Sequence, residues 1–209
     1  MGVGRPPGFP FNLNSAVDSL LKKEFDRYRE TQQSHPYCIE AKIDAVPFRH
    51  EKIDEWRDAL RKGVQFLHEA TNLILTGGVD DLWINKEGEV HVVDYKATSK
   101  NSEVNLDADW QRSYKRQVEI YQWLLKNNGL TISPIAYFVY CNGDANSENF
   151  NSVLNFKIKI IEYKGSIDWV ESALLKASTC LRSNEIPKGA ETCQYCCYFT
   201  EVKKALNPG

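Results

Sequence analysis

The sequence predicts an α/β fold in which helices flank a sheet that contains an antiparallel meander. Residues 64–68, 72–84 and 90–97 are rich in β-branched and aromatic side chains and are separated by short polar turns, which is typical of neighbouring strands. Residues 15–28 and 108–128 place apolar side chains three and four positions apart, as amphipathic helices do. We therefore expect strands in the middle of the chain and a long helix on either side of them.

The segments before the meander contain one clear helix. Asn14 or Ser15 is suited to begin it, and one apolar side is expected to face inward: Ala16, Leu20, Leu21, Phe25 and Tyr28. Residues 34–49 are expected to be irregular because Pro36 and Pro47 interrupt any helix.

The other elements follow from the same patterns. The helix over residues 108–128 carries one stripe, expected to lie mostly in the core: Trp110, Tyr114, Gln117, Tyr121 and Leu124 or Leu125. The remaining expectations are a helix with its apolar side inward at 51–62, strands at 132–141 and 152–163, an exposed loop at 142–151 and a helix at 167–181.

Residues 76–96, with the sequence TGGVDDLWINKEGEVHVVDYK, predict the hairpin around which the chain is organised. A polar turn with a glycine at 85–89 separates two strands. If Ile84 pairs with Val90, the register places Asp80 opposite Asp94. Side chains alternate along a strand, so Asp80, Asp94 and Lys96 share one face with four aliphatic residues: Leu82, Ile84, Val90 and Val92.

Two carboxylates on one apolar face call for a cation. Directly opposed residues have Cβ atoms about 5 Å apart, so Asp80 and Asp94 would repel each other without a positive charge between them. Mg²⁺ accepts one or two carboxylates and leaves its other positions to water and phosphate. The alternative is an amphipathic ribbon whose acids lie at a solvated rim. A bulge at Gly77 and Gly78 would turn Asp81 to this face in place of Asp80.

Three short motifs extend this interpretation. Residues 77–80 read GGVD, residues 94–96 read DYK and residues 117–121 read QVEIY. In this order they resemble the G-x-[IV]-D, D-Y-K and Q-x-x-x-Y motifs of the PD-(D/E)XK nuclease superfamily, specifically its RecB-like branch with the Cas4 and AddB-type nucleases. The resemblance implies a restriction-endonuclease-like core with a mixed central sheet. It also implies metal-dependent hydrolysis of phosphodiester bonds in DNA, of the exonuclease or end-processing type.

The resemblance implies roles for individual residues. Asp80 and Asp94 would bind Mg²⁺ or Mn²⁺, with the backbone carbonyl of Tyr95 as a further ligand. Lys96 would position the attacking water and neutralise charge on the phosphoryl oxygens. Gln117 would orient a water or a phosphate, and Tyr121 would pack near the nucleic-acid strand: the candidate site is therefore Asp80, Asp94, Tyr95, Lys96, Gln117 and Tyr121.

The first helix is a second source of site residues. In the family an early helix often supplies an acid or a histidine, and Glu24 and Asp26 are the local candidates. The alternative is that both acids belong to a solvated helix face. A catalytically silent module that binds nucleic acid or a partner protein is the alternative to the enzyme as a whole.

The length and the net charge of the chain limit these interpretations. At 209 residues the chain suits one domain, with an extended leader at 1–14 and a cysteine-containing tail at 183–209. The net charge of −2 gives no global basic field, so nucleic acid requires a local basic patch. Four residues are candidates for this patch: Lys100, Arg112, Lys115 and Arg116. The alternative is that they are solubilising charges, with Lys115 pairing with Glu119.

Localisation and partners follow from what the sequence lacks and from the resemblance. No apolar run approaches the roughly 20 residues that span a bilayer, and the first residues lack the apolar core of a signal peptide. We therefore expect a cytoplasmic protein without a membrane partner. DNA is the expected substrate, with RNA left open, and the need for a helicase or adaptation-complex partner is also left open.

The cysteine-containing tail suggests a further metal site. Cys193, Cys196 and Cys197 include a C-x-x-C spacing that can chelate zinc or an iron–sulfur cluster. Either needs about four ligands, and the relatives supply one cysteine from the first helix, where this chain has none. Cys38 or Cys180 would replace it only with different geometry. The alternative is a cysteine-containing packing segment.

Overall fold

The computed structural model describes residues 12–191, 193, 195, 196 and 198–200. They fall into two compact units, Met1–Val170 and Glu171–Gly209, which are described separately. Most of the expected leader, Cys197 and the end of the expected tail lie outside the described residues. The single-domain organisation stays a prediction.

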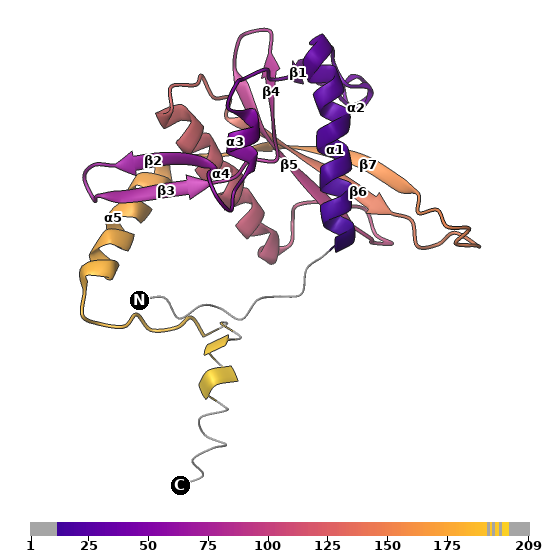
Figure 1. The fold of residues 1–209 in the computed structure, drawn as a ribbon. Helices are drawn as coiled ribbons and strands as arrows, with labels where there is room; N and C mark the ends of the chain where they lie inside the picture. Colours follow the sequence, from indigo (N-terminus) through magenta and orange to yellow (C-terminus); the bar gives the residue numbers. More distant parts are fainter. Residues whose placement is uncertain (1–11, 192, 194, 197, 201–209) are drawn as a thin grey trace. The chain divides into compact units, whose positions relative to one another are not determined.

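The first unit is built on a five-stranded mixed sheet with the order β1-β4-β5-β6-β7. β5 and β6 are parallel, whereas the other neighbours are antiparallel. Helices flank this sheet (Figure 1), so the predicted α/β class with a mixed central sheet is confirmed. The strands are β1 (Ala45–Pro47), β4 (Asp81–Asn85), β5 (Val90–Thr98), β6 (Ile135–Gly143) and β7 (Phe156–Lys164).

The hairpin of β4 and β5 has the predicted register. Ile84 pairs with Val90, and Leu82 pairs with Val92. β4 begins at Asp81, so Asp80 lies one residue before the strand, level with Asp94 when the register is continued. The alternation is also as expected, since Asp81 faces away from Asp80.

The predicted three-stranded meander is wrong. β2 (Val64–His68) and β3 (Leu73–Gly77) form a separate two-stranded sheet. The chain leaves β3 at the glycine pair because it passes too close to its neighbours for a side chain. A Cβ at Gly77 would lie 2.5 Å from Cε1 of Tyr121, and one at Gly78 would lie 2.2 Å from Cβ of Ala59. β4 then starts anew in the larger sheet.

The segment expected to be irregular contains regular structure. After α1 (Asn12–Thr31) come α2 (Pro36–Glu40) and β1. Pro36 begins α2, where its missing N–H costs no helical hydrogen bond. Pro47 lies in β1, which is an edge strand of the sheet and tolerates proline. The expectation of an irregular segment is therefore wrong, because each proline lies where its element accepts it.

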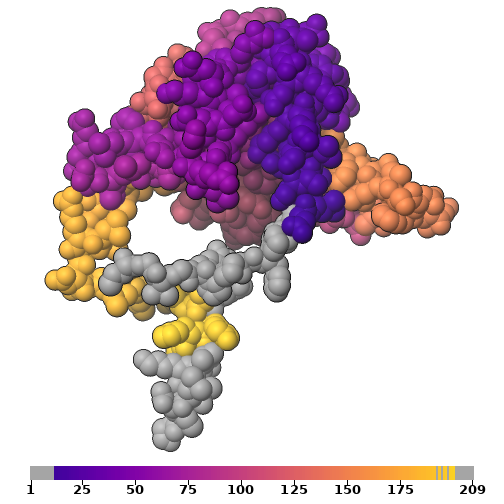
Figure 2. Space-filling view, viewed as in Figure 1, coloured from indigo at the N-terminus to yellow at the C-terminus, as the bar shows by residue number. Residues whose placement is uncertain are grey.

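The α1 face of the sheet carries an aromatic core. Phe25 stacks on Trp83 with ring centroids 5.3 Å apart, and Tyr95 lies beside them. The predicted apolar side of α1 is partly wrong, because Leu20 is 64% exposed while Arg29 is buried. In the space-filling view the indigo surface of α1 is exposed along its length (Figure 2). This core contains Leu21, Phe25, Cys38, Ala45, Trp83, Val93, Tyr95, Tyr137, Val139 and Cys141.

The remaining helices complete the first unit. α3 (Ile53–Arg57) is shorter than predicted, and Leu60 beyond it is almost fully exposed. The predicted helix over residues 108–128 consists of a 3₁₀ turn, η1 (Asp109–Gln111), followed by α4 (Arg112–Asn127). α4 contacts β5, β2 and β3. α5 (Asp168–Arg182) begins at the end of the first unit and continues in the second.

None of the described helices is both long and apolar enough to cross a bilayer.

Candidate active site

Asp80, Asp94 and Lys96 meet at the end of the hairpin. Asp94 and Lys96 lie two residues apart on β5 and therefore point to the same face. The backbone N–H of Tyr95, between them, donates a 2.9 Å hydrogen bond to Oδ2 of Asp80. β5 thus carries Asp94 and Lys96, and its backbone holds Asp80 through a hydrogen bond.

Asp94 is a buried acid that is paired with Lys96. Its side chain is 2% exposed, and Oδ2 is in ion-pair contact with Nζ of Lys96. No other described residue donates a hydrogen bond to this oxygen. Burial raises the pKa of Asp94 to about 7, with Lys96 opposing this rise and Asp80 adding to it. A carboxylate whose charged form is disfavoured by burial is suited to bind a divalent cation, which stabilises that charge.

Asp80 faces a lysine that the sequence reasoning missed. Nζ of Lys22, on α1, lies 3.5 Å from Oδ1 of Asp80 and 2.8 Å from Oδ2 of Asp18. Burial raises the pKa of Asp80, and Lys22 opposes this rise. Asp18 and Lys22 are one helical turn apart and read as an ordinary surface pair, so only the tertiary contact reveals them.

The structure does not bring the two expected acids of α1 to the site. Oε1 of Glu24 lies 2.9 Å from Nε2 of His35. Asp26 accepts hydrogen bonds from Arg57 and Arg29, at 2.9 and 3.0 Å. α1 reaches the carboxylate pair one turn earlier, through Asp18 and Lys22.

Asp81 lies on the opposite face of the hairpin, within a buried ionic network. It is fully buried and accepts hydrogen bonds from Arg29, from Nη2 of Arg57 at 3.0 Å and from the Tyr95 hydroxyl at 2.7 Å. Nε of Arg57 also donates to the backbone carbonyl of Asp80 at 3.1 Å. The network therefore binds the backbone that carries Asp80 and the side chain of Tyr95.

α4 closes the site on the other side. Nζ of Lys96 lies 4.5 Å from the ring centroid of Tyr114. Nε2 of Gln117 donates a 2.6 Å hydrogen bond to the hydroxyl of Tyr121. Burial raises the pKa of Tyr121, and the charges of Asp80 and Asp94 add to the rise, so this ring lies within electrostatic range of the acid pair.

A cleft of about 550 Å³ borders this side of the site. It is lined by residues of β3, η1 and α4, and the cationic and aromatic ones are Trp110, Arg112, Arg116 and Tyr121. Trp110 was expected in the core but is 56% exposed, because η1 precedes the helix and turns the indole outward.

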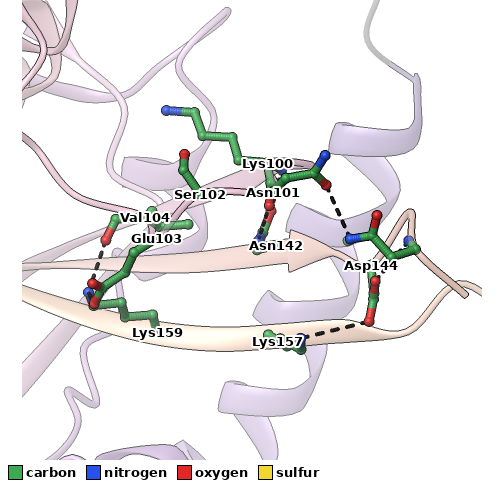
Figure 3. Close-up of a pocket in the computed structure, with 11 residues that line it drawn as sticks. Lys100, Asn101, Ser102, Glu103, Val104, Asn142, Asp144, Lys157 and Lys159 are labelled. Atoms are coloured by element: carbon green, nitrogen blue, oxygen red, sulfur yellow. Dashed lines mark hydrogen bonds and ion pairs between the residues drawn. The ribbon is translucent and has the colours of Figure 1, made fainter.

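The four expected basic residues do not line one cavity. Arg112 and Arg116 line the cleft, whereas Lys100 lines a separate cavity of about 310 Å³. In that cavity two other lysines have acidic partners, Lys159 with Glu103 and Lys157 with Asp144, while the Lys100 side chain extends away from both pairs (Figure 3). Nζ of Lys100 lies 5.4 Å from the ring centroid of Trp110.

Lys115 has a different environment from the one expected. Its Nζ lies 5.6 Å from the Tyr163 ring. Glu119, the partner considered for it, instead accepts hydrogen bonds from the Tyr163 hydroxyl, the Ser166 N–H and Nε1 of Trp169, at 2.7, 3.1 and 2.7 Å. This carboxylate joins α4 to β7 and to the start of α5.

The metal-binding capacity of the described residues is limited. They contain no group of three or more His, Cys, Asp or Glu side chains placed to hold a metal ion. The acid pair supplies two carboxylates, so a hard divalent cation there would complete its shell with carbonyl and water oxygens. Cys193 and Cys196 are described and Cys197 is not, so a zinc or iron–sulfur site in the tail stays a prediction.

Comparisons with known proteins agree with the motifs. The family model described as the PD-(D/E)XK nuclease superfamily matches residues 4–200. A solved structure titled "Crystal structure of SSO0001" is similar at 15% identity and a TM-score of 0.37, covering 90% of this chain and 80% of the other. A search of curated proteins found no match.

Proposed function

Because the chain belongs to the PD-(D/E)XK nuclease superfamily, we propose that it is a Mg²⁺- or Mn²⁺-dependent nuclease that hydrolyses phosphodiester bonds in DNA. The observation that carries the proposal is the buried acid pair beside a lysine. Oδ2 of Asp94 is paired with Lys96 and has no other described donor, and the charge of Asp80 acts on the same carboxylate. Two carboxylates and an ammonium on one face match the needs of phosphoryl transfer.

Asp80 and Asp94 would hold the cation, with the Tyr95 carbonyl as a third protein ligand. In a strand the N–H and C=O of one residue point to the same side. The Tyr95 N–H binds Asp80, so its carbonyl also faces the side of Asp80, where β4 has ended. A bound Mg²⁺ or Mn²⁺ would polarise the scissile phosphate and lower the pKa of a coordinated water.

Lys96 would donate to the phosphoryl oxygens and orient the attacking water. Its ammonium is fixed between the Asp94 carboxylate and the Tyr114 ring, so little reorganisation is needed when charge develops. Gln117 uses an N–H to bind Tyr121, which leaves its amide oxygen to accept from a water. Lys22, near Asp80, is a further cation for a phosphate oxygen.

The test is cleavage of end-labelled single- and double-stranded DNA with Mg²⁺, Mn²⁺ or EDTA. Wild type is compared with Lys96→Ala and with Lys86→Ala, a matched control on the exposed turn at the far end of the same hairpin. We expect metal-dependent cutting that falls by orders of magnitude in Lys96→Ala and persists in Lys86→Ala. Product lengths distinguish exonuclease from endonuclease action.

Equal cutting by wild type and Lys96→Ala would contradict the site assignment. Absence of cutting together with salt-sensitive DNA binding that needs no metal would favour a catalytically silent binding module. Manganese binding, measured by titration calorimetry in wild type and Asp94→Asn, separates these outcomes, because a silent module has no reason to bind the ion at this pair.

A further inference from the structure

Trp110 is an exposed aromatic residue on a rigidly held turn. Its side chain is 56% exposed, which is unusual for the largest apolar side chain. The next residue, Gln111, is fully buried. Its amide accepts a 3.0 Å hydrogen bond from the Ala108 N–H and donates a 2.7 Å bond to the Asn105 carbonyl. The indole is therefore presented by an ordered backbone.

The indole is connected to the candidate site through a row of rings and ammonium groups. Trp110 meets Tyr114 edge to face, with centroids 5.4 Å apart and an interplanar angle of 86°. Tyr114 in turn lies under Nζ of Lys96, at 4.5 Å. Lys100 lies 5.4 Å from the indole centroid. The row leads from the residue proposed to act on the phosphate to an exposed aromatic surface flanked by positive charge.

The cleft beside this row is cationic as well as aromatic. Two arginines, Arg112 and Arg116, and one acid, Asp109, line it together with Trp110, Gln117 and Tyr121. Rings that accept bases and cations that accept phosphates are the combination by which proteins bind single strands. A duplex keeps its bases stacked on one another and offers no face to an indole at the side of its helix.

Building on the proposed nuclease function, we infer that Trp110 is a stacking platform for an unpaired base and that the protein takes single-stranded nucleic acid. The base stacks on the indole while Lys100 and Arg112 contact the adjoining phosphates. The edge-to-face contact with Tyr114 sets the distance between the platform and Lys96. Trp110 is a binding residue in this account and touches no reacting atom.

The test uses the full chain in EDTA, where binding is measured without cleavage. Fluorescence anisotropy of a labelled oligothymidine and of a duplex of equal length is compared across wild type, Trp110→Ala, Trp110→Phe and Phe150→Ala. Phe150 is a matched control, since it is exposed and lies in the loop between β6 and β7. Stacking of one base implies that Trp110→Ala weakens single-strand binding about 5- to 150-fold.

The other variants and the duplex have their own expected results. Trp110→Phe retains a ring and should lose less than Trp110→Ala, Phe150→Ala should match wild type, and duplex binding should be unchanged throughout. Unchanged single-strand binding by Trp110→Ala, or an equal loss for the duplex, would overturn the platform.

A failed platform and a failed nuclease are distinguishable. If the wild type cuts DNA in a metal-dependent reaction and Trp110→Ala binds single strands normally, only the stacking platform is refuted. If the wild type never cuts DNA but Trp110→Ala selectively loses single-strand binding, the platform is supported and the nuclease function is refuted.

Discussion

At the scale of the residue, Asp80 and Asp81 are neighbours with opposite environments. Asp80 faces Asp94 and is partly exposed, whereas Asp81 is fully buried between Arg29 and Arg57 on the other face. Strand alternation separates them, so the sequence pattern alone could assign each acid to a face but could not identify the partners. Arg29 and Arg57 read as surface residues of their helices.

We expect Asp81→Ala to lower the free energy of unfolding by about 3–5 kcal/mol, because it leaves two buried guanidinium groups without their shared carboxylate. Asp80→Ala removes a charge that repels Asp94 and should change stability by less than about 1 kcal/mol. Urea denaturation of both variants in EDTA is the measurement. A larger loss in Asp80→Ala than in Asp81→Ala would contradict the assignment.

The Tyr95 hydroxyl offers a finer test of the same network. Tyr95→Phe removes its bond to Asp81 while keeping the ring and the backbone bond to Asp80. We expect a loss of about 1–3 kcal/mol in stability, as for a buried acceptor that loses a partner. Manganese affinity, measured by calorimetry, should fall by less than in Asp94→Asn. Equal losses of metal affinity in the two variants would argue that the network, rather than the acid pair, sets the affinity.

At the scale of the element, the glycine pair decides where the second β-sheet ends and the hairpin begins. A run of strand-forming residues from 72 to 84 predicts one long strand, and that prediction fails at Gly77 and Gly78. The close approach of Ala59 and Tyr121 is a tertiary constraint that no local pattern contains. The glycines themselves were the available signal, since a strand glycine often marks a close backbone contact.

Gly78→Ala should therefore be costly. Its Cβ would lie 2.2 Å from that of Ala59, so the backbone that leads to Asp80 must move. We expect loss of manganese affinity together with a stability loss of about 1–3 kcal/mol, as for overpacking. Gly143→Ala is the matched control, because its Cβ would meet neighbours at an ordinary 3.5 Å. Manganese affinity is measured by calorimetry and stability by urea denaturation in the two variants. Equal affinity and equal stability in both would refute the steric account.

At the scale of the whole molecule, the fold was predictable where a local pattern and the tertiary contacts agree. The hairpin register, the long helix after it and the later strands followed from alternation and helical spacing. The parallel pairing of β5 and β6 was available only through the family resemblance, since it joins residues 44 positions apart. Lys22 and Asp18 were missed at the site for the same reason, because their role depends on how α1 crosses the sheet.

A buried histidine makes part of the stability depend on pH. His91 is 6% exposed and binds the Ile135 carbonyl at 2.9 Å, and burial lowers its pKa below 6.5. The unfolded chain therefore binds more protons than the folded one as the pH falls below about 6.5, which removes stability. We expect His91→Gln to lose less stability than wild type between pH 8 and pH 5 in urea denaturation. Parallel pH dependences would contradict this.

Because β5 lies in the middle of the sheet, insertions and deletions within it would disturb the site. Its register with β4 and β6 decides which side chains face the acid pair, so one residue inserted between Asp94 and Lys96 would turn the lysine to the aromatic core. The exposed loop at 145–155 carries no such constraint. Tags, loops or fused domains intended to leave the site intact therefore belong in that loop, because β5 accepts no change of length.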